Sequence, residues 1–77
     1  MDKLYEINFI LSKVFKYKED AEYWLSLLPM RKDSVEIIRG YAKELLHANQ
    51  HNDIGEFLRV SNELVEMYRI NYDLYFK

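Results

Sequence analysis

Apolar residues recur every three or four positions along most of the chain, which is the spacing that places them on one face of a helix. No segment shows the strict alternation of apolar and polar residues that is typical of a half-buried strand. The pattern therefore predicts an all-α protein. Its four apolar runs predict a small four-helix bundle, with helices over residues 2–16, 19–28, 33–49 and 53–76.

Charged and conformationally restricted residues predict where these helices begin and end. Pro29 cannot continue a helix interior and disfavours helical angles in the residue before it, so the second helix should end there. Asp33 followed by Glu36 has the spacing of a capping box, in which the first side chain accepts from a free backbone N–H of the helix. Asp53 and Glu56 repeat this spacing ahead of the last apolar run.

The last predicted helix, residues 53–76, carries more apolar surface than one buried face needs. One stripe on it contains Ile54, Phe57, Leu58, Leu64, Val65, Tyr68, Tyr72 and Tyr75. A second stripe lies on another side and consists of Val60, Met67, Ile70 and Leu74. Positions 60, 67 and 74 are seven apart, which approximates a coiled-coil seam. If the first stripe packs inside the subunit, we expect the second to stay exposed.

Aromatic residues gather at the far end of this long helix, at Tyr68, Tyr72, Tyr75 and Phe76. Such residues are enriched in the cores of protein interfaces. The alternative is that the rings cap the end of the bundle inside one subunit. The first interpretation predicts an interface made by Val60, Met67, Ile70, Leu74, Tyr68, Tyr72 and Tyr75.

The simplest closed use of this surface is a two-fold homodimer in which helix 53–76 meets its copy. Acidic residues border the seam, and we expect ion pairs across it between Glu56 or Glu63 and Arg59 or Arg69. A larger protein as partner, or a monomer whose first helix covers the seam, are the competing outcomes.

The composition fits a single small domain, residues 1–77, that gains stability from association. A chain of 77 residues has a marginal core, and the absence of cysteine removes disulfides and thiolate metal sites. No apolar run reaches the length of a membrane span, and no signal peptide is evident, so we expect a cytoplasmic protein. Abundant Ile, Lys, Asn, Tyr and Phe have A/T-rich codons, which suits a phage or plasmid gene.

Catalytic and metal chemistry have little support in the sequence. His47 and His51 lie four residues apart and, with Glu44 or Asp53, have the spacing of a zinc site, but the HExxH pattern is absent. No serine lies in a nucleophile motif, and so small a chain has little room for a pocket. We therefore expect no enzyme, no cofactor, no metal and no small-molecule substrate.

Nucleic-acid binding is the main alternative. Residues 19–28 and 33–49 can be arranged as a helix-turn-helix in which the second helix reads DNA. The basic side chains available to it are Arg31, Lys32, Arg39, Lys43 and His47. Against this, Glu36 and Glu44 flank the basic line, and the net charge of the whole chain is −2.

The function that the sequence favours is therefore protein–protein interaction by a non-enzymatic regulator, inhibitor or adaptor. Two single residues carry further expectations. Trp24 is in phase with the apolar residues of its helix and should anchor the core. Gly40 lies inside a helix, where it either allows another backbone to approach closely or faces open solvent.

Overall fold

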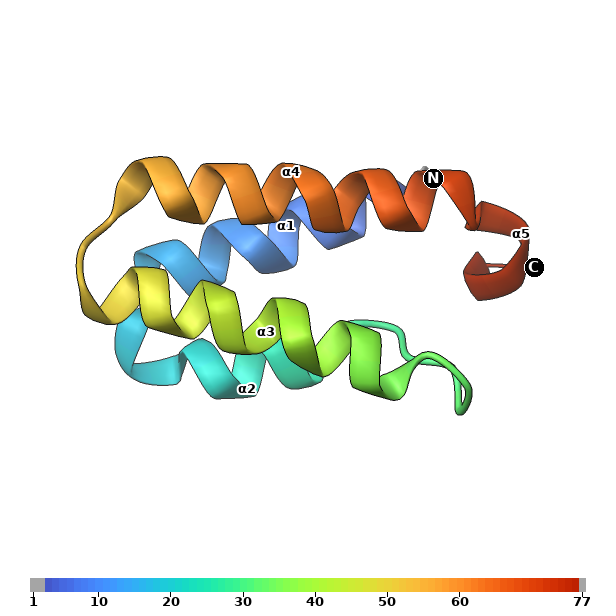
Figure 1. Cartoon of the computed structure of the whole chain (residues 1–77), viewed down its shortest axis with the longest axis horizontal. Helices are drawn as coiled ribbons and strands as arrows, with labels where there is room; N and C mark the ends of the chain where they lie inside the picture. The colour runs from blue at the N-terminus through green and yellow to red at the C-terminus, as the bar shows by residue number, and fades with distance from the viewer. Residues whose placement is uncertain (1–2, 77) are drawn as a thin grey trace.

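The computed structural model describes residues 3–76 and is all-α over that range. Its elements are α1 (Lys3–Lys16), the 3-10 helix η1 (Lys18–Asp20), α2 (Ala21–Ser26), α3 (Val35–Gln50), α4 (Ile54–Ile70) and α5 (Tyr72–Phe76). Helices α1 to α4 run in alternating directions, and α5 turns back across one end of the bundle (Figure 1). The predicted all-α fold is confirmed, while the expected start of the first helix at residue 2 lies outside the described residues.

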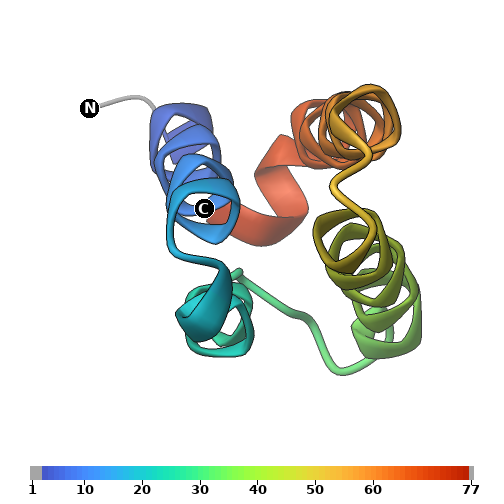
Figure 2. The same ribbon diagram turned by 90° about the vertical axis from the view of Figure 1, so that its left-hand side faces the viewer.

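The core lies between the four antiparallel helices, which Figure 2 shows end on. Seven large side chains in it have essentially no exposed surface, and they come from α1, α3 and α4: Ile7, Val14, Ile38, Leu45, Val60, Leu64 and Tyr68. The short α2 adds Ala21 and Leu25. The buried Asn49 amide of α3 donates a 2.9 Å hydrogen bond to the Val14 carbonyl, one of the last carbonyls of α1. That bond satisfies an acceptor that the end of a helix leaves free.

The segment between α2 and α3 departs from the sequence prediction. Helix α2 ends at Ser26, and the next two amides donate to carbonyls three residues back, so the last turn before Pro29 is tighter than an α-helix. The predicted capping box at Asp33 is wrong, because the N-cap residue of α3 is Ser34 and its side chain makes no capping bond. The Asp33 carboxylate instead accepts from the Arg31 guanidinium at 3.2 Å.

The connection between α3 and α4 is fixed by backbone hydrogen bonds at both ends. Asn52 has a φ of 53°, and Asn tolerates this left-handed conformation better than most residues. The Asp53 amide then donates to the Ala48 carbonyl at 2.9 Å, which completes a Schellman motif at the end of α3. The Asp53 carboxylate accepts from the Glu56 amide at 3.0 Å, so this predicted helix cap is confirmed.

The predicted long helix over residues 53–76 is wrong, because it breaks at Asn71. The side-chain amide of Asn71 donates to the Met67 carbonyl at 2.9 Å, alongside the backbone amide of Asn71 at 3.1 Å. An Asn side chain that competes for a helix carbonyl in this way favours a helix end. The Asn71 carbonyl then accepts the first bonds of the five-residue helix α5.

Candidate protein-interaction surfaces

Aromatic and aliphatic side chains gather on the outer face shared by α1 and α2, and we call this surface the α1–α2 patch. Its members are Tyr5, Phe9, Tyr23, Trp24 and Leu27. Four of them, together with Glu6 and Ile10, line an apolar hollow of about 400 Å³. Large apolar side chains that stay in contact with water around such a hollow are typical of a binding surface.

Three of the four rings of the patch contact one another. Phe9 and Trp24 pack edge to face with ring centroids 6.2 Å apart, and Tyr23 packs edge to face on Trp24 at 5.5 Å. The ammonium group of Lys13 lies 5.1 Å from the centre of the Phe9 ring. The patch is thus an ordered surface built by two helices, with Lys13 and Glu6 at its margin.

The expected exposure of the second α4 stripe is wrong for Val60. Val60 has no exposed surface and belongs to the core that α4 shares with α1 and α3. Met67 is partly buried against that core. Ile70 remains 69% exposed on α4, whereas Leu74 lies beyond the break, on α5. The four residues therefore do not form one continuous seam.

Of the predicted interface aromatics, Tyr68 packs inside the subunit, while Tyr72 and Tyr75 are half-buried in contacts with other rings of the chain. Tyr68 is completely buried, and its ring packs edge to face on Tyr75 at 5.0 Å and lies 5.8 Å from Phe76. Tyr72 packs on Phe76 at 5.0 Å. Burial raises the pKa of the Tyr68 hydroxyl well above its ordinary value. These rings close the end of the bundle through α5.

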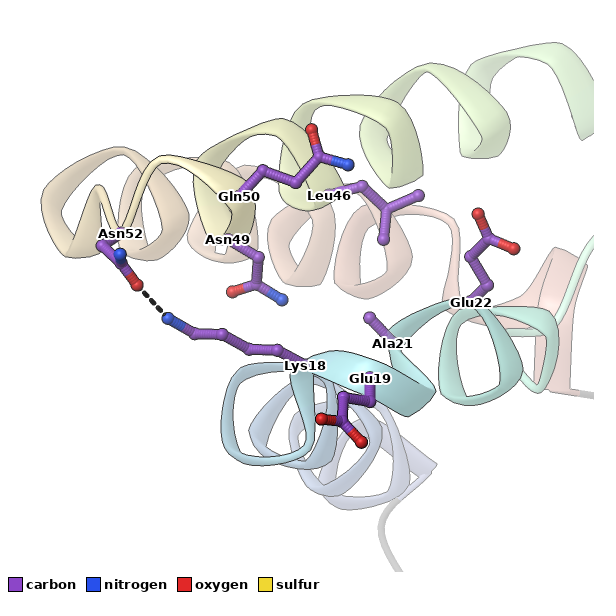
Figure 3. Close-up of a pocket in the computed structure, with 8 residues that line it drawn as sticks. All are labelled: Lys18, Glu19, Ala21, Glu22, Leu46, Asn49, Gln50 and Asn52. Atoms are coloured by element: carbon purple, nitrogen blue, oxygen red, sulfur yellow. Dashed lines mark hydrogen bonds between the residues drawn. The ribbon is translucent and has the colours of Figure 1, made fainter.

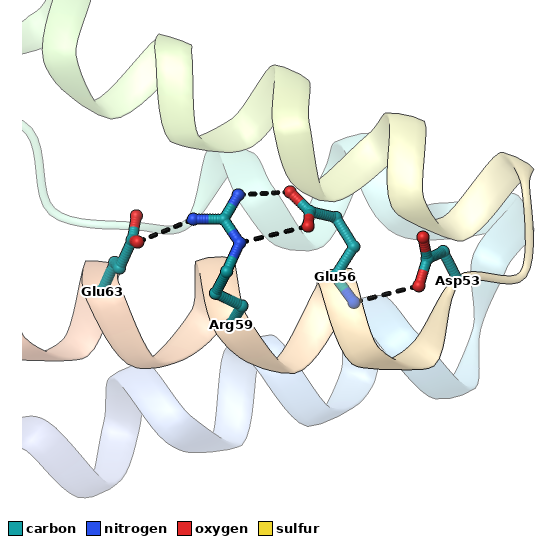
Figure 4. A network of polar contacts seen from close by, with 4 residues as sticks. All are labelled: Asp53, Glu56, Arg59 and Glu63. Carbon is teal, nitrogen blue, oxygen red and sulfur yellow. Dashed lines mark hydrogen bonds and ion pairs between the residues drawn. The ribbon is translucent and has the colours of Figure 1, made fainter.

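The ion pairs expected across a dimer seam form within α4. Arg59 lies between two carboxylates of its own helix, as Figure 4 shows: it donates to Glu63 at 2.7 Å and pairs with Glu56 on the other side. The hydrogen bond from Arg59 lowers the pKa of Glu56. Arg69 pairs in the same way with Glu66, one turn before it. The charged side chains of these exposed pairs therefore have partners within α4 and do not need a second subunit.

The basic residues of the DNA-binding alternative lie on α3 and on the connection before it. Arg39, Lys43 and His47 are exposed along α3 as expected, but Arg31 is engaged with Asp33 and donates to the Leu74 carbonyl at 3.0 Å. Lys32 is exposed on the connection. Helices α2 and α3 run side by side in opposite directions (Figure 1), whereas the helices of a helix-turn-helix cross at about 90–120°.

Gly40 of α3 faces open space. No atom lies within 4 Å of the position that a Cβ would occupy, so the expectation of a close backbone approach is wrong within the subunit. The other expectation, that the glycine lies on an open side of the helix, is confirmed.

A second hollow, of about 430 Å³, lies between η1, α2 and the end of α3 (Figure 3). Its polar groups are partly paired within the chain. Lys18 reaches across to the side-chain oxygen of Asn52, and the Asn49 amide is engaged with the Val14 carbonyl. These two bonds hold α1 and η1 to the end of α3 and to the turn that follows it, which gives the hollow a structural role.

The rings of His47 and His51 contact each other in a tilted arrangement, with ring centroids 4.3 Å apart. Among residues 3–76, no group of three or more His, Cys, Asp or Glu side chains is close enough to share a metal ion. Within the same residues, no helix combines the length and apolar character needed to cross a membrane.

Sequence reasoning missed the α1–α2 patch as a surface. Trp24, which we expected in the core, is only partly buried, and Tyr5, Phe9 and Leu27 were not selected. A signal was present: Tyr5 and Phe9 are four residues apart and lie off the Ile7, Leu11, Val14 stripe.

No protein-family model, curated protein or solved structure matches this chain.

Proposed function

We propose that the protein acts by binding another protein surface, as a small non-enzymatic regulator, inhibitor or adaptor. The observation that carries this proposal is the α1–α2 patch. Rings from Tyr5, Phe9 and Trp24 line an apolar hollow, and the rings of Phe9 and Trp24 pack on each other. Because such rings are already ordered, a partner that covers them gains apolar burial at a small cost in side-chain entropy.

Charge supports a protein partner over a nucleic acid. The net charge is −2, and the margin of the patch includes an acidic side chain, Glu6, and a basic side chain, Lys13. A phosphate backbone is bound by a concentrated basic face, because neutralising phosphates supplies most of the non-specific affinity. A mixed polar margin around an apolar centre is instead the usual layout of a protein interface.

Site-specific photo-crosslinking tests this proposal directly. Phe9 is replaced by benzoylphenylalanine, which keeps an aromatic ring at a position that is 46% exposed. The matched control carries the same group at Ile37, which is 55% exposed on α3. Irradiation in an extract of the source cells should give protein adducts from position 9, and excess unlabelled protein should suppress them. Position 37 should give none.

Two results would contradict the proposal. The first is the absence of protein adducts from position 9 both in the extract and with the purified protein. The second is binding to DNA at physiological salt that is lost in Arg39→Ala and Lys43→Ala, which would favour the DNA-binding regulator instead.

A further inference from the structure

We propose that the partner of the α1–α2 patch is the same patch of a second copy, in a two-fold dimer whose α1 helices lie antiparallel and cross near Phe9. This inference rests on the proposed function and names its partner. The dimer contact then lies on α1 and α2, and not on the predicted α4 seam, where Val60 is buried.

The exposed apolar area of the patch matches what a small dimer needs. Tyr5 is 65% exposed, Tyr23 61%, and Phe9 and Leu27 46% each. With about 150–250 Å² for a whole aromatic side chain, these fractions amount to roughly 400–500 Å² per copy. Two copies with their polar margins then bury about 1,000 Å², which is the lower limit for a specific interface. Each copy contributes about a tenth of its 5377 Å² of accessible surface, the usual share for a small protein.

The charges at the margin of the patch are complementary under a two-fold axis. Glu6 lines the hollow, and Lys13 lies over the Phe9 ring on the same helix. The two residues are seven positions apart, or about 10 Å along α1, and the midpoint between them falls beside Phe9. An antiparallel copy that crosses there brings Glu6 of each subunit to Lys13 of the other, so the pair forms twice.

Contacts within the subunit leave these two charges available. Glu6 pairs with Lys3 at 3.7 Å, and both side chains are about half exposed, so this contact contributes little. Lys13 rests on the rings of Phe9 and Tyr17, which are themselves 46% and 42% exposed. Lys13 has no ion pair among the described residues, so the Glu6 carboxylate of the second copy can approach it at the expense only of the exposed Glu6–Lys3 contact.

Sedimentation velocity on the purified protein, at about 1–200 µM, tests the inference. The wild-type protein should dimerise with a Kd of about 1–10 µM, in keeping with an interface of this size. Phe9→Glu should weaken the dimer at least 100-fold, because it places a charge in the centre of the interface. Phe9 is half exposed, so the circular dichroism spectrum should not change. Leu58→Glu is the matched control, since Leu58 is 55% exposed on α4, and it should remain dimeric.

A charge swap identifies the two-fold arrangement itself. Glu6→Lys and Lys13→Glu alone should each weaken the dimer about tenfold, since each creates two like-charged contacts. The double variant should return to within about threefold of wild type, because both pairs re-form with reversed sign. If Glu6 and Lys13 acted only within their own subunit, the double variant would not regain dimerisation.

The inference is overturned by a wild-type protein that stays monomeric at 200 µM, by a double variant that does not recover, or by a Leu58→Glu variant that dissociates as Phe9→Glu does. If the protein is monomeric while position 9 crosslinks to a different protein, the proposed function stands and the second copy is the wrong partner. If no protein crosslinks at position 9, the proposed function itself fails.

Discussion

The hydroxyl of Tyr68 donates a 2.6 Å hydrogen bond to the carbonyl oxygen of Pro29, 39 residues earlier in the chain. The donor lies near the end of α4, and the acceptor belongs to the connection between α2 and α3. A few residues further on, Arg31 of the same connection donates to the Leu74 carbonyl of α5. The irregular segment of the fold is thus held by the closed aromatic end of the bundle.

Removing this hydroxyl should destabilise the fold. Tyr68→Phe keeps the buried ring but leaves the Pro29 carbonyl without its donor, which should lower the free energy of unfolding by about 1–2 kcal/mol. Urea denaturation measures the change. Tyr17→Phe is the control, because Tyr17 is 42% exposed and should change stability by less than about 0.5 kcal/mol. Equal effects of the two variants would show that the Tyr68 bond does not contribute.

The same residue should make the fold sensitive to alkali. Burial raises the pKa of Tyr68 in the folded protein above its unfolded value of about 10, so the folded state keeps a proton that the unfolded state releases. This contribution to stability is complete below pH 10 and falls as the pH rises further, by up to about 1.4 kcal/mol per pH unit. The difference between wild type and Tyr68→Phe, followed by denaturation between about pH 8 and 11, isolates it. A constant difference would rule the effect out.

The two acidic residues predicted as helix caps should behave differently. Asp53→Ala removes the carboxylate that accepts from the Glu56 amide, so it should cost about 1 kcal/mol. Asp33→Ala removes an exposed pair with Arg31 and a long, exposed hydrogen bond from the Ser34 hydroxyl, and should leave the unfolding midpoint unchanged. Thermal unfolding compares them at one pH. A larger loss for Asp33→Ala would mean that its carboxylate caps α3 in solution.

Ser61 offers a stabilising substitution. Its side chain is 8% exposed, and its hydroxyl oxygen has no hydrogen-bond partner. Ser61→Ala removes this unsatisfied group and improves helix propensity, so stability should rise by about 1 kcal/mol. Ser12→Ala is the control, because it brings the same gain in helix propensity but loses the 2.7 Å bond to the Phe9 carbonyl. A loss of stability in Ser61→Ala would reveal a partner for the hydroxyl, such as a bound water.

Periodicity and capping residues were enough to predict most of the fold. The observed bounds of α1 and α3 differ by about two residues or less from the predicted ones, and so does the start of α4. These bounds were predictable because each helix has an apolar face with regular spacing. The break at Asn71 was missed because Tyr72 and Tyr75 continue the helical spacing beyond it. What ends the helix is a local side-chain hydrogen bond, which periodicity does not report.

The candidate surface was harder to predict for a different reason. The sequence shows that α4 has two apolar stripes and that α1 carries Phe9 outside its main stripe, but not which of these faces meets another helix. In the structure, Val60 is enclosed in the core, whereas Phe9 stays 46% exposed. Which apolar face stays in water is a property of the tertiary arrangement, and the pattern along one helix does not determine it.

The Schellman motif at Asn52 also bears on the order in which the chain assembles. Its bonds and the Asp53 cap join residues only a few positions apart, so closing the α3–α4 hairpin has a small entropic cost. The bonds from Asn49 to Val14 and from Tyr68 to Pro29 span 35 and 39 residues and close much longer loops. We therefore expect the hairpin to form in the folding nucleus, and α1 and the Pro29 segment to dock onto it later. Stopped-flow φ-values should be high for Asp53→Ala and low for Tyr68→Phe, and the reverse order would show that long-range docking comes first.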